Sequence, residues 1–224
     1  MKQTAATIEY MERDVKAMER AEPQTAFLLK RLKRHHAPTY RKSLLTAYYS
    51  LQLAKALGFT REEQTVLFRT ALLQDIGKLH ISRDILDSRN RLYQGAVWQM
   101  QTHPKYSADI LQTFIASGEV DGEAVLQHHE NLDGTGYPSA LNWKSITLNA
   151  RILRIAGSYT ELTDAQGAAR LGPREAMEEL YCWSDVLYDA DLVELMNHLI
   201  RQTTTEDAVK GDGAHELAAR NRKS

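Results

Sequence analysis

Apolar residues at helical spacing, with almost no strict apolar–polar alternation, constrain the fold of this chain more than any other feature. The stretch from Thr39 to Leu57 shows the pattern best, and Gly58 follows where a helix of this kind ends. Its inward stripe is formed by Leu44, Leu45, Tyr48, Leu51 and Leu57. Glycine (12) and proline (5) are scarce among the 224 residues. The sequence therefore predicts an all-α fold, built as a compact helical bundle.

Prolines and capping residues divide the chain into candidate helices. Thr60 and Glu63, for example, form a capping box at the start of one of them. We expect helices at about 4–21, 24–35, 39–57, 60–75, 104–116, 123–130, 147–162, 174–183 and 191–200, with one long loop at 131–145. The predicted organisation is an N-terminal helical extension (1–37), one main domain (38–203) and a polar C-terminal tail (204–224).

Charge and cysteine content argue against several classes of protein. The formal net charge is −1, which gives no general electrostatic case for binding nucleic acid, and the basic stretch Lys30–His36 is typical of a solvated helix face. No charge-free apolar run is long enough to cross a bilayer, and the first residues lack the apolar core of a signal peptide. The single cysteine, Cys182, excludes an intramolecular disulfide framework and agrees with a reducing compartment. We therefore expect a cytoplasmic protein.

Three stretches carry polar residues that a helical core does not need. They are Gln74–Lys78 (QDIGK), His103-Pro104, and His128–Pro138 (HHENLDGTGYP). The last has adjacent histidines followed by two glycines and a proline, so its backbone shape is specified. Taken alone, each stretch fits an ordinary helix end or turn. Their order and spacing together indicate a functional site.

From about Thr39 to Ile200 the sequence resembles the HD-GYP family, a branch of the HD superfamily of metal-dependent phosphohydrolases. The resemblance is carried by TYRKS, LAKALGF, ALLQDIGKLHIS, HPKYSADIL, HHENLDGTGYP, RILRIAGSYTELT and DADLVELM, in that order. It implies the HD-superfamily helical bundle with an HD-GYP loop. The usual activity in that family is hydrolysis of cyclic di-GMP, a bacterial second messenger.

The resemblance transfers the family's functional residues only in part. The kept metal-ligand positions are Asp75, His103, His128 and His129, and the kept loop residues are Asp133, Gly134, Gly136, Tyr137 and Pro138. Three ligand positions are lost, since Lys42 and Gln74 stand where the family has histidines and Gly157 stands where it has an aspartate. A substrate-binding R-P-Y-R segment of the family corresponds here to Gln166–Ala169, which carries no cation.

The remaining ligands are too few for two metal ions of ordinary coordination number. At best they complete one site of three histidines and one carboxylate, which suits Zn, Fe or Mn. The expected cofactor is therefore none or one divalent metal ion. If the protein is active, Asp75 and Lys78 are the candidate catalytic residues. Lys78 keeps a phosphate-facing position of the family, although a lysine near a helix C-terminus explains it equally well.

Lys42 has two possible explanations. If the family geometry holds, its ammonium lies near Asp75 and takes over the charge-balancing role of a metal ion. The alternative is that Lys42 extends to solvent and Asp75 caps a turn. Removing the ammonium would destabilise the protein only in the first case.

Three functions remain open. The first is a degenerate, non-catalytic HD-GYP domain that acts in bacterial signalling by binding a nucleotide or another protein. The resemblance suggests a diguanylate cyclase as partner, because members of the family contact such domains through the GYP region. The second is an active metal-dependent phosphohydrolase, a cyclic di-GMP phosphodiesterase with a reduced single-metal site. The third is a helical module without ligand. We expect no membrane partner, and residues 1–37 could form a homodimer contact.

Overall fold

The computed structural model describes residues 2–88, 93–164 and 170–202. Within these ranges the chain is helical, with turns and two isolated bridges, which confirms the all-α prediction. The helices are α1 (Lys2–Ala21), α2 (Pro23–His35), α3 (Ala37–Ala56), α4 (Arg61–Leu73), the 3-10 helix η1 (Ile76–His80), α5 (Arg83–Leu86), α6 (Gln94–Gln101), α7 (His103–Ile110), α8 (Gln112–Ala116), α9 (Gly122–Gln127), α10 (Leu148–Asp164) and α11 (Pro173–Cys182). A further helix runs over 190–202. The expected tail 204–224 and the segment 166–169 lie outside the described residues.

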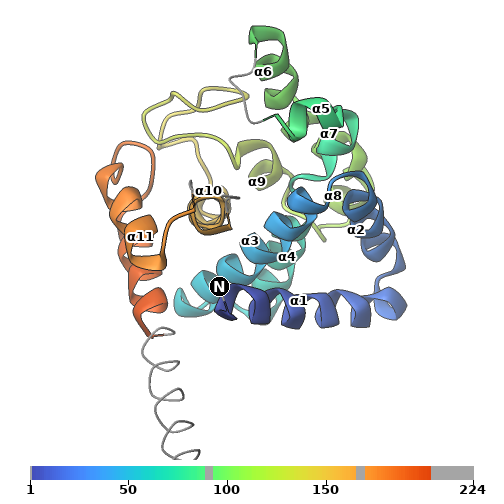
Figure 1. Ribbon diagram of the computed structural model, residues 1–224, viewed down its shortest axis with the longest axis horizontal. Coiled ribbons are helices and arrows are strands. Elements are labelled where there is room, and N and C mark those ends of the chain that lie inside the picture. The colour runs from blue at the N-terminus through green and yellow to red at the C-terminus, as the bar shows by residue number, and fades with distance from the viewer. Residues whose placement is uncertain (1, 89–92, 165–169, 203–224) are drawn as a thin grey trace, which may run out of the picture.

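Helix α3 lies at the centre of the bundle. It packs against α4 and α10, and α1 and α2 cover it (Figure 1). Leu44 and Leu45 are fully buried, as their spacing predicts, whereas Leu57 is 39% exposed. The reason is that α3 ends at Ala56, so Leu57 is the C-cap, and Gly58 then turns the chain at φ 76°. The capping box of Thr60 and Glu63 starts α4 as expected.

The predicted helix boundaries are wrong in one region, which is the one that builds the candidate site. The helix expected over 60–75 ends at Leu73, the one over 104–116 breaks at Leu111, and the one over 123–130 ends at Gln127. Helices α5 and α6 were not expected. Both helices are short, with four and eight residues. Their buried residues Ile85 and Ala96 pack with Ile81 in a small cluster separate from the main core, and α6 leaves Trp98 65% exposed.

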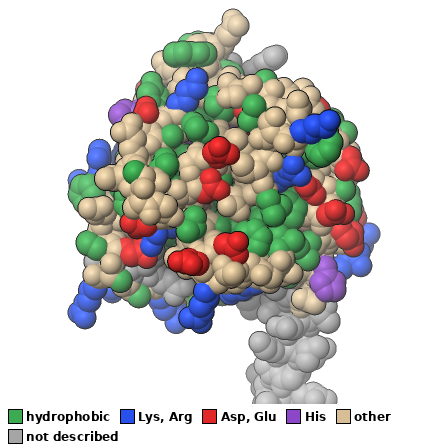
Figure 2. Space-filling view, turned by 180° about the vertical axis from the view of Figure 1, so that it is seen from behind, with side chains coloured by type: hydrophobic (Ala, Val, Ile, Leu, Met, Phe, Trp, Pro, Cys, Tyr) green, Lys and Arg blue, Asp and Glu red, His purple; other side chains and the backbone are tan. Residues whose placement is uncertain are grey.

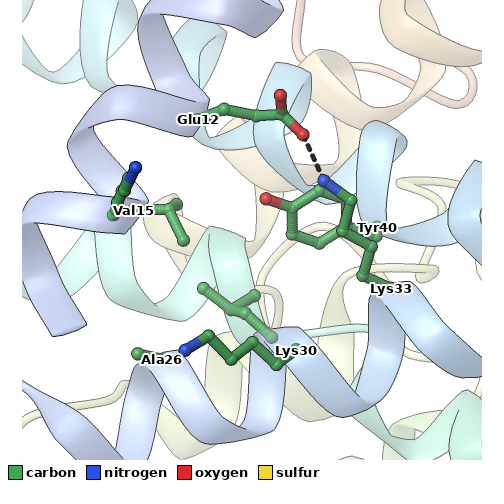
Figure 3. Close-up of a pocket in the computed structure, with 8 residues that line it drawn as sticks. Glu12, Val15, Ala26, Lys30, Lys33 and Tyr40 are labelled. Carbon is green, nitrogen blue, oxygen red and sulfur yellow. Dashed lines mark hydrogen bonds and ion pairs between the residues drawn. The ribbon is translucent and has the colours of Figure 1, made fainter.

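A cavity of about 290 Å³ lies between α1, α2 and α3 (Figure 3). The ammonium of Lys33 contacts the Glu12 carboxylate at 2.6 Å and lies 4.9 Å from the centre of the Tyr40 ring. These contacts connect α2 to α1 and to α3. None of the polar stretches singled out by sequence lines this cavity.

The surface mixes charges of both signs. Figure 2 shows acidic and basic side chains interspersed with apolar ones over one face of the molecule. Among the described helices, none combines the length and the apolar character that a membrane span requires.

Candidate metal centre

Four side chains from separate segments meet at one point. Asp75 lies between α4 and η1, His103 is the first residue of α7, and His128 and His129 follow α9. One nitrogen or oxygen atom of each lies within 4.8 Å of the others. We call these four residues the His–Asp cluster. The structure thus brings together all four metal-ligand candidates kept from the family pattern.

Close packing of η1 against α7 brings Asp75 to His103. A Cβ atom on Gly77 would lie 2.2 Å from the His103 carbonyl oxygen, so only glycine fits there without a backbone shift. The hydroxyl of Ser107 donates to the Gln74 carbonyl at 2.6 Å and accepts from the Gly77 amide at 2.8 Å. This single hydroxyl fixes α7 on the turn that carries Asp75.

Backbone carbonyls fix the orientation of two imidazole rings. His103 Nδ1 lies 2.6 Å from the Met100 carbonyl, and His128 Nδ1 lies 2.7 Å from the Val125 carbonyl. Because a carbonyl only accepts, each Nδ1 carries a proton, and the second nitrogen of each ring, Nε2, faces away from that carbonyl. Metal-ligating histidines are commonly held in this way.

The two Nε2 atoms lie close to one another and to a carboxylate. The Nε2 atoms of His103 and His128 lie 3.2 Å apart, and Asp75 Oδ1 lies 3.0 and 3.6 Å from them. Asp75 Oδ1 and His129 Nε2 are buried with no hydrogen-bond partner among the described residues. Nitrogen and oxygen donors that converge on one buried point fit a cation, so the donor set fits one divalent metal ion.

The charges around the cluster keep these ligands in their metal-binding forms. Burial alone would raise the pKa of Asp75, but the ammonium groups of Lys78, at 3.0 Å, and Lys42, at 4.0 Å, hold it well below its ordinary value. Burial together with Lys78 lowers the pKa of His103 to about 4, and burial holds that of His129 well below its ordinary value. The carboxylate is therefore ionised and these two imidazoles are neutral near pH 7.

The three positions that lost a family ligand lie in different surroundings. Lys42 forms an ion pair with Glu161 in addition to its contact with Asp75, and its side chain is 16% exposed. Of the two explanations for Lys42, the geometry thus favours charge pairing over extension into solvent. Gln74 is buried, and its Oε1 has no hydrogen-bond partner among the described residues. Gly157 is buried on α10, and a Cβ atom there would meet nothing within 4 Å.

The loop that contains Asp133, Gly134, Gly136, Tyr137 and Pro138, which we call the GYP loop, covers one side of the cluster. The Tyr137 ring stacks on His129, with centroids 4.6 Å apart and an interplanar angle of 17°. Gly136 is required because a Cβ would lie 2.4 Å from the Asn131 nitrogen, and Gly134 turns the chain at φ 82°. Asp133 accepts hydrogen bonds from the Thr135 amide and hydroxyl at the exposed tip. Tyr137 and the following Pro138 are only partly exposed. Tyr137 thus contacts the site itself.

Sequence reasoning missed three polar residues that shape the site. The buried carboxylate of Glu130 accepts from the backbone amides of Ser139 and Leu141, at 2.7 and 3.0 Å, and so fixes the GYP loop. Glu161 pairs with Lys42. The Arg154 guanidinium donates two hydrogen bonds to Asn131 Oδ1, at the start of the GYP loop. Helical spacing could have identified Glu161 and Arg154, because both lie on the same helix face as Gly157, a lost family ligand position.

Comparison with known proteins supports the resemblance. The 3'3'-cGAMP-specific phosphodiesterase 1 of Vibrio cholerae serotype O1 is 38% identical over 128 residues, which are 57% of this chain and 30% of that protein. The cyclic di-GMP phosphodiesterase response regulator RpfG of Xanthomonas campestris pv. campestris is 30% identical over 149 residues, 64% of this chain and 39% of that protein. The chain thus spans well under half the length of these two relatives.

Solved structures show the same fold. Bd1817, a HDG"Y"P protein from Bdellovibrio bacteriovorus, superimposes with a TM-score of 0.59 at 22% identity, over 72% of this chain and 52% of that one. The HD domain of L. monocytogenes phosphodiesterase PgpH, in complex with cyclic-di-AMP, has a TM-score of 0.58 at 14% identity, over 80% and 96% of the two chains. The protein-family model described as HD domain matches residues 21–192. The chain therefore belongs to the HD domain family, and its relatives are of the HD-GYP type.

Proposed function

We propose that the protein is a phosphodiesterase of the HD-GYP type that uses a single divalent metal ion and acts on a cyclic dinucleotide. The observation that carries this proposal is the His–Asp cluster, in which neutral imidazole nitrogens and one ionised carboxylate converge within 4.8 Å. The substrate class is supported by relatives whose names specify cyclic di-GMP and 3'3'-cGAMP. This proposal is the second of the three functions considered from the sequence.

The chain's own residues have distinct tasks in such a reaction. Asp75 and the three histidines would hold the metal ion, which supplies Lewis-acid polarisation of a phosphoryl oxygen. Lys78 and Lys42 place two ammonium groups beside the Asp75 carboxylate, where they offset the negative charge of a phosphodiester. Tyr137 covers His129 and keeps water from that side of the site.

A specific observation favours a second candidate, the non-catalytic regulatory domain. The Lys42 ammonium lies 4.0 Å from Asp75 Oδ2, and Gly157 offers no ligand, so these two family positions supply no donor for a second metal ion. A domain of this kind would bind a nucleotide or a signalling protein such as a diguanylate cyclase, with the GYP loop as its contact surface. A homodimer contact through residues 1–37, the domain boundaries and the cytoplasmic location stay predictions.

Metal content and turnover, measured together, separate the two candidates. The purified protein is assayed by elemental analysis, and hydrolysis of cyclic di-GMP and 3'3'-cGAMP is followed with Mn, Fe or Zn present. The proposal expects about one metal equivalent, as the ligand count implies, and turnover that His128→Ala abolishes. His198→Ala is the matched control, since His198 is exposed on the helix over 190–202. One metal equivalent with no turnover of either dinucleotide would refute the catalytic proposal and support the regulatory one.

A further inference from the structure

A hollow lies over Gly157 in an otherwise filled part of the bundle. Gly157 is buried in the middle of α10, yet a Cβ atom built on it would meet no atom within 4 Å. Buried helix surfaces are normally packed against neighbouring side chains. The space therefore has room for a group that the chain itself does not supply.

Charged side chains on the same helix face surround this hollow. Arg154 lies three residues before Gly157 and Glu161 lies four residues after it, so both lie beside it on α10. Lys42 reaches the same place from α3, because its ammonium pairs with Glu161. Burial lowers the pKa of Lys42, but Glu161 and Asp75 raise it above its ordinary value, and the charge of Arg154 opposes them. Arg154 is thus within electrostatic reach of Lys42.

The guanidinium of Arg154 is held in position before any ligand arrives. Its Nε and Nη2 donate to Asn131 Oδ1 at 3.0 and 2.9 Å, and its Nη1 donates to the Ser158 hydroxyl at 2.5 Å. The ring of Tyr188 lies 5.0 Å from its central carbon. A guanidinium has more N–H donors than these bonds use, so some remain for a ligand. A pre-oriented guanidinium is well suited to hold a phosphate group.

The charges around the hollow do not balance. Lys42, Lys78 and Arg154 are cationic, and Asp75 and Glu161 are the carboxylates that contact the two lysines. One positive charge is therefore in excess among these residues, before any metal ion is counted. The side chain of Glu161 is 56% exposed, so this carboxylate has room to move away from Lys42.

We propose that the hollow over Gly157 is a phosphate subsite, in which Lys42 and Arg154 hold the anion and Glu161 is displaced from Lys42 as it enters. The assignment of this anion to a phosphodiester of the substrate rests on the proposed function. The subsite itself does not depend on a metal ion, because its residues are separate from the imidazole ligands. It compensates for the cations missing from 166–169 in the sequence.

The test uses the 224-residue chain in EDTA, titrated at constant ionic strength with inorganic phosphate and, in parallel, with cyclic di-GMP. Backbone amide NMR shifts report where each anion binds, with Gly157 and Ser158 as the expected reporters. The variants are Arg154→Gln, Gly157→Leu and Glu161→Gln. Arg174→Gln is the control, because Arg174 forms an exposed pair with Glu178 on α11. Thermal melts verify that each variant is folded. Arg154→Gln also removes the hydrogen bonds to Asn131 at the start of the GYP loop, whereas Gly157→Leu leaves them in place and so tests the hollow independently.

We expect Arg154→Gln to weaken phosphate binding about tenfold, in line with the loss of a charge-assisted hydrogen bond. Gly157→Leu fills the hollow and abolishes binding, Glu161→Gln strengthens it, and Arg174→Gln leaves it unchanged. Folded Arg154→Gln and Gly157→Leu proteins that titrate like the parent would overturn the subsite, even if hydrolysis persists. Localised phosphate binding, combined with no turnover in the separate assay with Mn, Fe or Zn present, overturns the proposed function instead. Binding of inorganic phosphate alone overturns the assignment to a cyclic dinucleotide.

Discussion

The Nε2 atoms of His103 and His128 lie 3.2 Å apart, and each ring donates its Nδ1–H to a backbone carbonyl on the opposite side. Two lone pairs at that distance repel unless a cation lies between them. A divalent metal ion held between these two nitrogens would stabilise the folded protein.

The first prediction follows from this arrangement. Adding Zn²⁺ or Mn²⁺ raises the thermal midpoint of the protein, by the equivalent of about 2.7 kcal/mol when the ion exceeds its dissociation constant a hundredfold. His128→Ala abolishes the shift, whereas His198→Ala, on the exposed face of another helix, retains it. Differential scanning calorimetry with and without a chelator measures the effect. Equal melting curves for the chelated and the metal-loaded parent protein would contradict the prediction.

The second prediction concerns Lys42. Lys42→Met removes one of the two ammonium groups beside the buried Asp75 carboxylate and leaves Lys78 in place. Because one partner remains, we expect a loss of about 1–2 kcal/mol in the free energy of unfolding of the metal-free protein, less than the loss of a sole partner causes. Urea denaturation measures this loss. Lys55→Met, at an exposed position of the same helix, is the control and should unfold like the parent. An unchanged stability in Lys42→Met would mean that Asp75 does not need this charge.

The third prediction concerns the ring that covers the site. Tyr137→Ala removes the stack on His129 and opens this ligand to water. An aromatic contact of this kind contributes about 0.5–1.5 kcal/mol, so metal affinity should fall up to about tenfold. Tyr137→Phe keeps the ring and should keep the affinity. Calorimetric titration with Zn²⁺ compares the three proteins, and an equal loss in both variants would assign the effect to the hydroxyl.

The fourth prediction is a pH dependence away from the site. Arg69 Nε donates to Glu22 Oε2 at 2.9 Å and lowers the pKa of Glu22 from its ordinary value of 4.5. The folded state therefore binds this proton less readily than the unfolded state. The pair's contribution is present above pH 4.5 and is lost as the pH falls through the lower folded pKa.

Glu22→Gln should accordingly cost about 1 kcal/mol of unfolding free energy near pH 7, and progressively less as the pH falls below 4.5. Urea midpoints at several pH values test this expectation. Glu9→Gln, at an exposed intrahelical pair, is the control, and its difference from the parent in unfolding free energy should not change with pH in this way. A constant difference between Glu22→Gln and the parent across the pH range would show that protonation of Glu22 is not responsible.

The ligands of the His–Asp cluster could be identified from sequence because each belongs to a contiguous motif. Asp75 precedes a glycine that close packing requires, and the paired histidines precede a loop whose glycines are required by close approach and by a positive φ. Local sequence therefore specifies these segments. The near approach of Lys42 to Asp75 also followed from the resemblance.

The partners of those residues could not be read in the same way. Glu161 meets Lys42 across 119 positions of sequence, and Arg154 meets Asn131 across 23. Such pairings depend on how α10 is rotated against α3 and the loop, which periodicity leaves open. Helices α5 and α6 were missed for a related reason. They are short and pack against a cluster outside the main core, so no long apolar stripe marks them.

The carbonyl anchors on His103 and His128 have a consequence for the speed and selectivity of ion uptake. Rings that are locked before the ion arrives need no reordering, so capture loses little conformational entropy and the rate depends mainly on how quickly the ion sheds its water. The same rigidity fixes the distances between the donor atoms. Ions whose preferred bond lengths do not match these distances are disfavoured however abundant they are.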